Sequence, residues 1–186
     1  TGTITRGQPQ VTNITLFYSG LTERELVKYA ASVEKRSEHP LAEAVVAEAN
    51  ILEVELADST DFFAVVGRGA KAFVDGRKVV VGSRRLMEEE NLDTSNAVSV
   101  LEKYQDEGKT VILVAVDGRL AGLLAVADTI KTGSSEAIQH LDQMGLQVVM
   151  LTGDNRQTAL AIGRQVGVDQ VYAEVLPGGK IDLIRK

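Results

Sequence analysis

The chain has 186 residues, enough for one ordinary domain or for two small domains that each bury a core. Hydrophobic residues make up 44% and charged residues 25%, which argues against disorder and fibrous repeats, and the lack of cysteine excludes disulfides and thiolate metal sites. The net charge of −6, with scattered basic residues, argues against a nucleic acid as partner.

Two helices are predicted near the start of the chain. Apolar residues recur at helical spacing after Thr22, and Thr22 with Glu25 has the form of a capping box. Pro40 is unsuited to a helix interior but suits a first turn, so the first helix ends before it and a second spans residues 41–50. The corner between them is Ser37-Glu38-His39-Pro40.

Strand patterning with two hairpin signals follows. Asp75-Gly76 and Asp117-Gly118 each separate two apolar strands, and Asp-Gly is a strong hairpin signal because both turn residues must reach positive φ. The predicted strands are residues 70–74, 78–82, 110–116 and 120–126. A helix over residues 96–108 lies between the hairpins, so we expect residues 13–124 to form an α+β unit on an antiparallel sheet.

Beyond residue 125 the pattern alternates between strands and helices. The predicted strands are residues 123–126, 147–151 and 171–173, and the predicted helices are residues 134–145 and 156–166. Such alternation predicts a parallel sheet covered on both faces, in which ligands bind at the carboxyl ends of the strands.

A possible anion site lies at one of those ends. In Thr152-Gly153-Asp154-Asn155, a hydroxyl, a glycine and the amides of the following helix could face a phosphate. The same residues could equally form a loop with a helix cap. Lys180 follows another strand, where its charge could reach the same phosphate, although a surface lysine is the simpler interpretation.

Three motifs in order carry a family resemblance. Thr1-Gly2-Thr3, Thr152-Gly153-Asp154-Asn155 and Leu176-Pro177-Gly178-Gly179-Lys180 resemble the motifs of P-type ATPases. In that family, an Asp-Lys pair whose aspartate is phosphorylated by ATP precedes the first motif, and a magnesium-binding Gly-Asp-Gly-x-Asn-Asp motif follows later. We therefore expect the chain to be a fragment without the phosphorylated aspartate.

The intervening segment resembles the nucleotide-binding domain of the heavy-metal-transporting subfamily. The matching elements are Ser37-Glu38-His39-Pro40-Leu41, Gly67-Arg68-Gly69, and Val81-Gly82 before Arg85-Leu86-Met87. The resemblance implies an α/β fold: an incomplete haloacid dehalogenase-like phosphorylation domain, residues 1–12 and 125–186, with an inserted nucleotide-binding domain, residues 13–124.

The resemblance implies roles in ATP binding for five residues. Glu38 would accept a hydrogen bond from the adenine amino group, and His39 would stack on or hydrogen-bond to adenine. Gly67 and Gly69 would let the backbone approach the nucleotide, and Gly82 would lie near the adenine. From the residues alone, His39 could instead be a structural corner and the glycines could be turn residues.

The resemblance also implies roles in phosphoryl transfer and in Mg²⁺ binding. Thr1 would offer its carbonyl to Mg²⁺, Thr3 and Thr152 would hold the transferred phosphoryl group, and Lys180 would neutralise its charge. Asp154 belongs to the same catalytic set.

Asp128 could help to hold that side of the site or could cap a helix. Three positions depart from the family pattern: Ser83 replaces the usual asparagine, Lys131-Thr132-Gly133 replaces a proline-containing segment, and Gly179 replaces an acidic residue.

The expected function is that of the cytosolic ATP-binding region of a copper(I)-exporting P-type ATPase. Its cofactors would be ATP and Mg²⁺, and its partners would be the transported metal and the actuator and transmembrane domains of the same parent chain. Residues 84–89 and Thr5-x-Gly7-x-Pro9 resemble copper exporters. The alternatives are a zinc or cadmium exporter, a nucleotide-binding module without turnover, and a soluble dehalogenase-like phosphatase with a cap domain.

Overall fold

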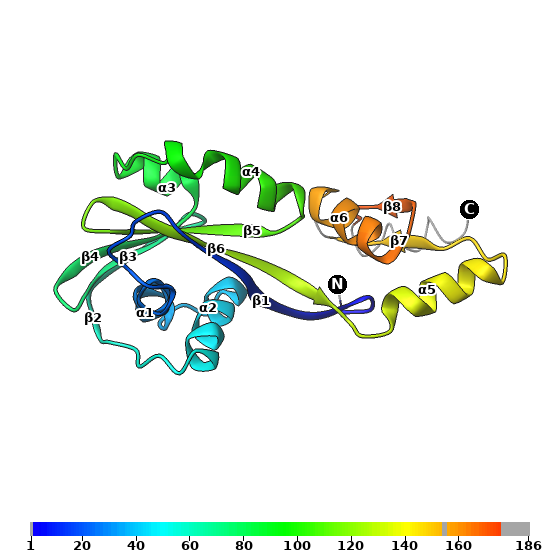
Figure 1. The fold of residues 1–186 in the computed structure, drawn as a ribbon, viewed down its shortest axis with the longest axis horizontal. Coiled ribbons are helices and arrows are strands. Elements are labelled where there is room, and N and C mark those ends of the chain that lie inside the picture. Colours follow the sequence, from blue (N-terminus) through cyan, green and yellow to red (C-terminus); the bar gives the residue numbers. More distant parts are fainter. Residues whose placement is uncertain (1, 154–155, 176–186) are drawn as a thin grey trace. The chain divides into compact units, whose positions relative to one another are not determined.

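The computed structural model describes residues 2–153 and 156–175, which form two compact units (Figure 1). The larger unit consists of Pro9–Glu102 and Thr110–Ala127. The smaller unit consists of Thr1–Gln8, Lys103–Lys109 and Asp128–Lys186. Each unit is therefore assembled from segments that are distant in the sequence.

The larger unit is built on a six-stranded sheet with the strand order β1-β6-β5-β4-β3-β2. The strands are β1 (Thr5–Leu16), β2 (Ser59–Val65), β3 (Gly69–Val74), β4 (Arg77–Gly82), β5 (Thr110–Val116) and β6 (Arg119–Ile130). Neighbouring strands from β2 to β6 pair antiparallel. Both predicted hairpins are present, and Asp75 and Asp117 each adopt a φ of 49° in the turns.

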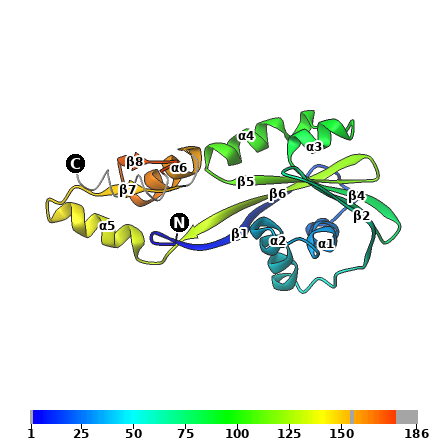
Figure 2. The ribbon, with the colours of Figure 1, turned by 180° about the vertical axis from the view of Figure 1, so that it is seen from behind.

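Helices lie on both faces of this sheet (Figures 1 and 2). One face carries α1 (Glu23–Glu34) and α2 (Pro40–Ile51), and the other carries α3 (Arg84–Glu89) and the start of α4 (Val98–Asp106), which follows the 3₁₀ turn η1 (Ser95–Ala97). The predicted capping box at Thr22 is confirmed. Apolar side chains of α1, α2 and the facing side of the sheet form one core cluster, and Leu86 and Met87 of α3 are buried as well.

The smaller unit contains a two-stranded parallel sheet of β7 (Val149–Leu151) and β8 (Gln170–Tyr172). Its helices are α5 (Ser134–Gln143) and α6 (Arg156–Val166). Ile138, Met150 and Val166 belong to its buried core.

One predicted strand is in the wrong sheet. Residues 123–126 were expected both to end the hairpin strand 120–126 and to open the parallel sheet. The first expectation is confirmed and the second is wrong, because they continue β6 and pair antiparallel with β5. All four of these residues are buried because helices cover both faces of the central strands. A continuous apolar run therefore marks a strand buried on both faces in either kind of sheet.

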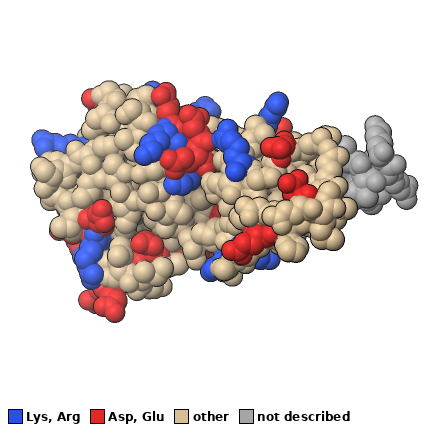
Figure 3. Space-filling model, turned by 45° about the vertical axis from the view of Figure 1, so that its right-hand side comes forward, with Lys and Arg blue, Asp and Glu red and all other residues tan. Residues whose placement is uncertain are grey.

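None of the helices within residues 2–153 and 156–175 has the length and apolarity that crossing a membrane requires. On the face seen in Figure 3, acidic and basic side chains are interspersed. This face therefore lacks the uniformly basic patch that is typical of nucleic-acid binding.

Candidate functional site

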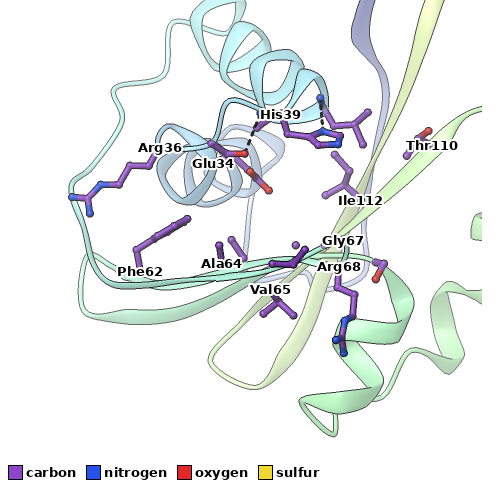
Figure 4. Close-up of a pocket in the computed structure, with 18 of the residues that line it drawn as sticks. Glu34, Arg36, His39, Phe62, Ala64, Val65, Gly67, Arg68, Thr110 and Ile112 are labelled. Atoms are coloured by element: carbon purple, nitrogen blue, oxygen red, sulfur yellow. Dashed lines mark hydrogen bonds between the residues drawn. The ribbon is translucent and has the colours of Figure 1, made fainter.

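A cavity of about 470 Å³ lies in the larger unit, between the α1–α2 corner and the turn that joins β2 to β3 (Figure 4). This volume lies in the range of small-molecule sites. The residues that line it include Glu34, Arg36, Ser37, His39, Phe62, Ala64, Gly67, Arg68, Gly69, Gly82, Ser83 and Ile112. Of the five residues predicted to bind nucleotide, His39, Gly67, Gly69 and Gly82 meet here.

His39 both starts α2 and lines the cavity. It is the N-cap of the helix, and its Nδ1 accepts a hydrogen bond of 3.2 Å from the backbone N–H of Leu41 (Figure 4). Pro40 occupies the first turn, where its missing donor costs nothing. With Nδ1 accepting, a neutral imidazole carries its proton on Nε2 and keeps one donor for a ligand. The structural and the binding interpretation of His39 are therefore compatible.

The carboxyl group that lines the cavity belongs to Glu34, which lies outside the sequence motifs. Glu34 ends α1 and is only 9% exposed, and burial raises the pKa of its carboxyl group, although a hydrogen bond with Ser37 acts in the opposite direction. Glu38, the predicted contact, is exposed and does not line the cavity. The structure therefore favours Glu34 over Glu38 as the group that faces a ligand.

Helical spacing carried a signal for Glu34. The residue lies four positions after Ala30 and directly after Val33, both fully buried. Its carboxyl group is therefore on the apolar face of α1 at the end of the helix. A charged residue on an apolar helix face, immediately before a polar corner, is a candidate site residue.

Gly69 and Gly82 are required by the packing of two strands. They pair with each other across β3 and β4. A Cβ on Gly69 would lie 2.1 Å from the carbonyl oxygen of Val81, and one on Gly82 would lie 2.1 Å from that of Arg68. Both glycines thus permit a close backbone approach within the protein itself.

Gly67 differs from this pair. It has a φ of 69°, and a Cβ built on it would meet no atom within 4 Å. Its backbone therefore borders open space at the cavity, as the predicted close approach of a ligand requires.

The turn that carries Gly67 is tied to α3. The backbone N–H of Ser83 donates to the carbonyl of Arg68 at 2.7 Å, and the Arg68 guanidinium forms an ion pair with Glu89 at 2.5 Å. Ser83 is also the N-cap of α3, and its hydroxyl accepts from Leu86 N–H. Serine and asparagine are both good N-caps, so the departure at residue 83 preserves the start of the helix.

In the smaller unit, Asp128 binds backbone groups near the start of the chain. Its carboxylate accepts hydrogen bonds from the backbone N–H groups of Gly7, at 3.0 Å, and Gln8, at 3.2 Å. The helix-capping alternative for Asp128 is wrong, because the residue lies in β6 and the N-cap of α5 is Gly133.

Lys131, one of the departures from the family pattern, also holds the N-terminal segment. Its ammonium group donates to the carbonyl of Gly2 at 2.6 Å, and the Ser134 hydroxyl donates to that of Ile4 at 3.0 Å. Backbone groups near Thr3 are therefore fixed by side chains from residues 128–134.

The predicted catalytic residues are only partly described. Thr152 is 2% exposed at the carboxyl end of β7, where its N–H donates to the carbonyl of Tyr172 at 2.9 Å. Thr3 is exposed. Thr1, Asp154 and Lys180 lie outside the described residues, so the arrangement of the five stays a prediction.

Comparisons with known proteins find one family along the whole chain. The family model of the haloacid dehalogenase-like hydrolases matches residues 1–186. A copper-exporting P-type ATPase of Staphylococcus saprophyticus is 43% identical over 185 residues, which make up 100% of this chain and 22% of the relative. The chain thus spans about a fifth of the length of the curated relatives it matches.

Solved structures match either nearly the whole chain or about two thirds of it. A zinc-transporting PIB-type ATPase in the E2.Pi state matches 99% of this chain with a TM-score of 0.89 and 33% identity, over 29% of its own chain. The N-domain of HMA8, a copper-transporting P-type ATPase, matches 63% of this chain with a TM-score of 0.54 and 32% identity, over 99% of its own.

Proposed function

Because the chain belongs to the haloacid dehalogenase-like hydrolase family, we propose that its larger unit binds ATP as the nucleotide-binding domain of a heavy-metal-transporting P-type ATPase. The observation that carries this proposal is the cavity that brings together Glu34, His39 and Gly67 from two separate segments. The domain boundaries near residues 12 and 124 are part of the same proposal.

The cavity offers the groups that a nucleoside triphosphate needs. A buried carboxyl group at Glu34 accepts a hydrogen bond from an exocyclic amino group, and the free ring nitrogen of His39 donates to the base or orients the phosphates. The open backbone at Gly67 admits the nucleotide closely. Apolar side chains such as Ala64 and Ile112 cover the base.

The smaller unit carries the residues proposed for phosphoryl transfer. Thr3 and Thr152 hold the transferred group, Lys180 neutralises its charge, and Asp154 completes the set. Mg²⁺ accompanies the nucleotide, with the carbonyl of Thr1 as its proposed protein ligand.

In the parent protein, ATP would phosphorylate an aspartate that precedes Thr1, and hydrolysis of that aspartyl phosphate would drive export of copper(I). Copper is preferred because the curated relative is a copper exporter, and zinc is the second candidate because a zinc transporter matches 99% of the chain. On this proposal the chain is a cytoplasmic part of a membrane protein and works with its actuator and transmembrane domains.

A calorimetric titration with ATP, with and without magnesium, tests nucleotide binding. We expect saturable binding that His39→Gln weakens at least tenfold. The matched control is His140→Gln, which changes the only other histidine, in α5 of the smaller unit, and should leave the affinity unchanged. A folded chain that fails to bind ATP, or that binds it equally well after His39→Gln, would contradict the proposal.

A further inference from the structure

The pairing of β2 with β3 is irregular next to Phe62, which lines the cavity. Thr60 pairs with Phe73 and Phe63 pairs with Lys71, so Asp61 and Phe62 together stand opposite one residue of β3. This is a β-bulge, and Asp61 adopts a φ of 50°, which is unusual for a residue with a side chain.

The bulge decides which of two adjacent aromatic rings enters the cavity. In a regular strand Phe62 would share the outer face with Thr60, because side chains alternate. The extra residue instead places Phe62 on the side of the core and the cavity, where it is half-buried. Phe63 consequently points outward, is 59% exposed and has the ammonium group of Lys71 over its ring.

Phe62 stands where a flat ligand needs an apolar surface. Figure 4 shows its ring projecting from β2 into the space below α1, toward the side where Glu34 lies. Among the described residues that line the cavity, Phe62 carries the one benzene ring. An aromatic face beside a buried hydrogen-bonding group is a common way to recognise a nucleobase, because stacking holds the ring and the polar group reads its edge.

We infer that Phe62 supplies the face on which the base of the bound nucleotide stacks, and that the bulge at Asp61 directs it there. This inference rests on the proposed function, and it adds a residue that determines affinity for the base. Packing against the core alone would need only an apolar side chain of similar volume, so leucine at this position separates the two roles.

Titration of the full chain with magnesium ATP provides the test. Because stacking of a base on an aromatic ring contributes to the binding free energy, Phe62→Leu should weaken ATP binding about tenfold. Phe62→Tyr keeps the aromatic face and should stay within about twofold of the unsubstituted chain. Phe63→Leu, which removes the neighbouring ring outside the cavity, should leave the affinity unchanged.

NMR of the bound nucleotide distinguishes stacking of the base on Phe62 from a role of Phe62 in core packing alone. The H2 and H8 protons of adenine should shift upfield on binding and show nuclear Overhauser contacts with the Phe62 ring, and the shift should vanish in Phe62→Leu. If Phe62→Leu binds ATP with the original affinity, or if the upfield shift persists, the inference is overturned while nucleotide binding stands. If the unsubstituted folded chain binds no ATP, both the inference and the proposed function fail.

Discussion

The two units of the chain differ in the size of their cores and in how the residues of their proposed sites are distributed along the sequence. Among the described residues, one core cluster of the larger unit contains 21 buried hydrophobic residues, whereas the core cluster of the smaller unit contains five. Every residue that lines the cavity belongs to the larger unit. In the smaller unit, the residues proposed for phosphoryl transfer extend from Thr1 to Lys180.

This difference follows from how each site is held. The proposed nucleotide site consists of a helix corner and a strand turn that rest on one shared core, so local folding is enough to position them. The residues proposed for phosphoryl transfer belong to the smaller unit, whose described core is small, and small cores provide little stability. We therefore expect the larger unit to be the more stable of the two and to bind nucleotide by itself.

Core truncations in the two units should have separate effects, and the larger unit should show the largest change. Leu26 is fully buried, and Leu26→Ala should lower the free energy of unfolding of the larger unit by about 2–5 kcal/mol. Ile138→Ala should destabilise only the smaller unit. Hydrogen exchange in increasing urea, resolved by peptide, measures both. Equal loss of protection in both units after either substitution would show that they unfold as one body.

Alanine at two neighbouring glycines should separate folding from binding inside the larger unit. Gly69→Ala should cost at least about 2 kcal/mol, because its Cβ would clash with a backbone oxygen that cannot move without displacing β4. Gly67→Ala should cost only about 1 kcal/mol, for the positive φ, yet it should weaken ATP binding. Urea unfolding and calorimetry give the two quantities, and similar stability losses in both variants would refute the distinction.

A substitution at Asp128 should destabilise the smaller unit alone. Asp128→Asn keeps the shape of the side chain but removes the charge that strengthens its hydrogen bonds to Gly7 and Gln8. We expect a loss of about 1 kcal/mol, below the usual range for hydrogen bonds to charged groups, because these hydrogen bonds are exposed to solvent. Amide exchange should accelerate at residues 2–8 and stay unchanged in α1 and α2. Faster exchange throughout the larger unit would contradict this assignment.

A substitution at Glu34 should change the stability by a similarly small amount, and only at higher pH. Burial raises its folded pKa above the unfolded value, so the unfolded state loses the proton first and stability falls as pH rises through the folded pKa. Glu34→Gln should remove that fall and gain roughly 1 kcal/mol at neutral pH, with no gain at pH 4. Thermal unfolding between pH 4 and 8 measures it, with exposed Glu38→Gln as control. Parallel profiles for Glu34→Gln and the unsubstituted chain would contradict the burial effect.

Local signals in the sequence predicted much of the fold. The capping box at Thr22, the start of α2 at Pro40 and both Asp-Gly hairpins are present, because each depends on a few adjacent residues. The expected α/β fold with an antiparallel sheet and the resemblance to heavy-metal P-type ATPases are confirmed. Residues 123–126 were rightly placed in the second hairpin, but their second assignment, to the parallel sheet, was wrong because burial on both faces erases the alternation that distinguishes antiparallel strands.

The site was predicted less completely. Motif residues such as His39 and Gly67 line the cavity, whereas Glu34 and Phe62 come from outside the motifs. The position of Glu34 in the cavity depends on the helical register of α1, and that of Phe62 depends on a bulge that shifts the strand by one residue. One extra residue reverses the faces of a strand, so alternation alone would have placed Phe63 in the cavity.

Amide hydrogen exchange of the full chain, with and without magnesium ATP, tests most directly whether the larger unit contains the complete nucleotide site. We expect added protection at residues 34–41 and 62–69, and unchanged exchange across α5, β7 and α6. Protection that appears mainly in the smaller unit, or that is absent although calorimetry detects binding, would contradict it.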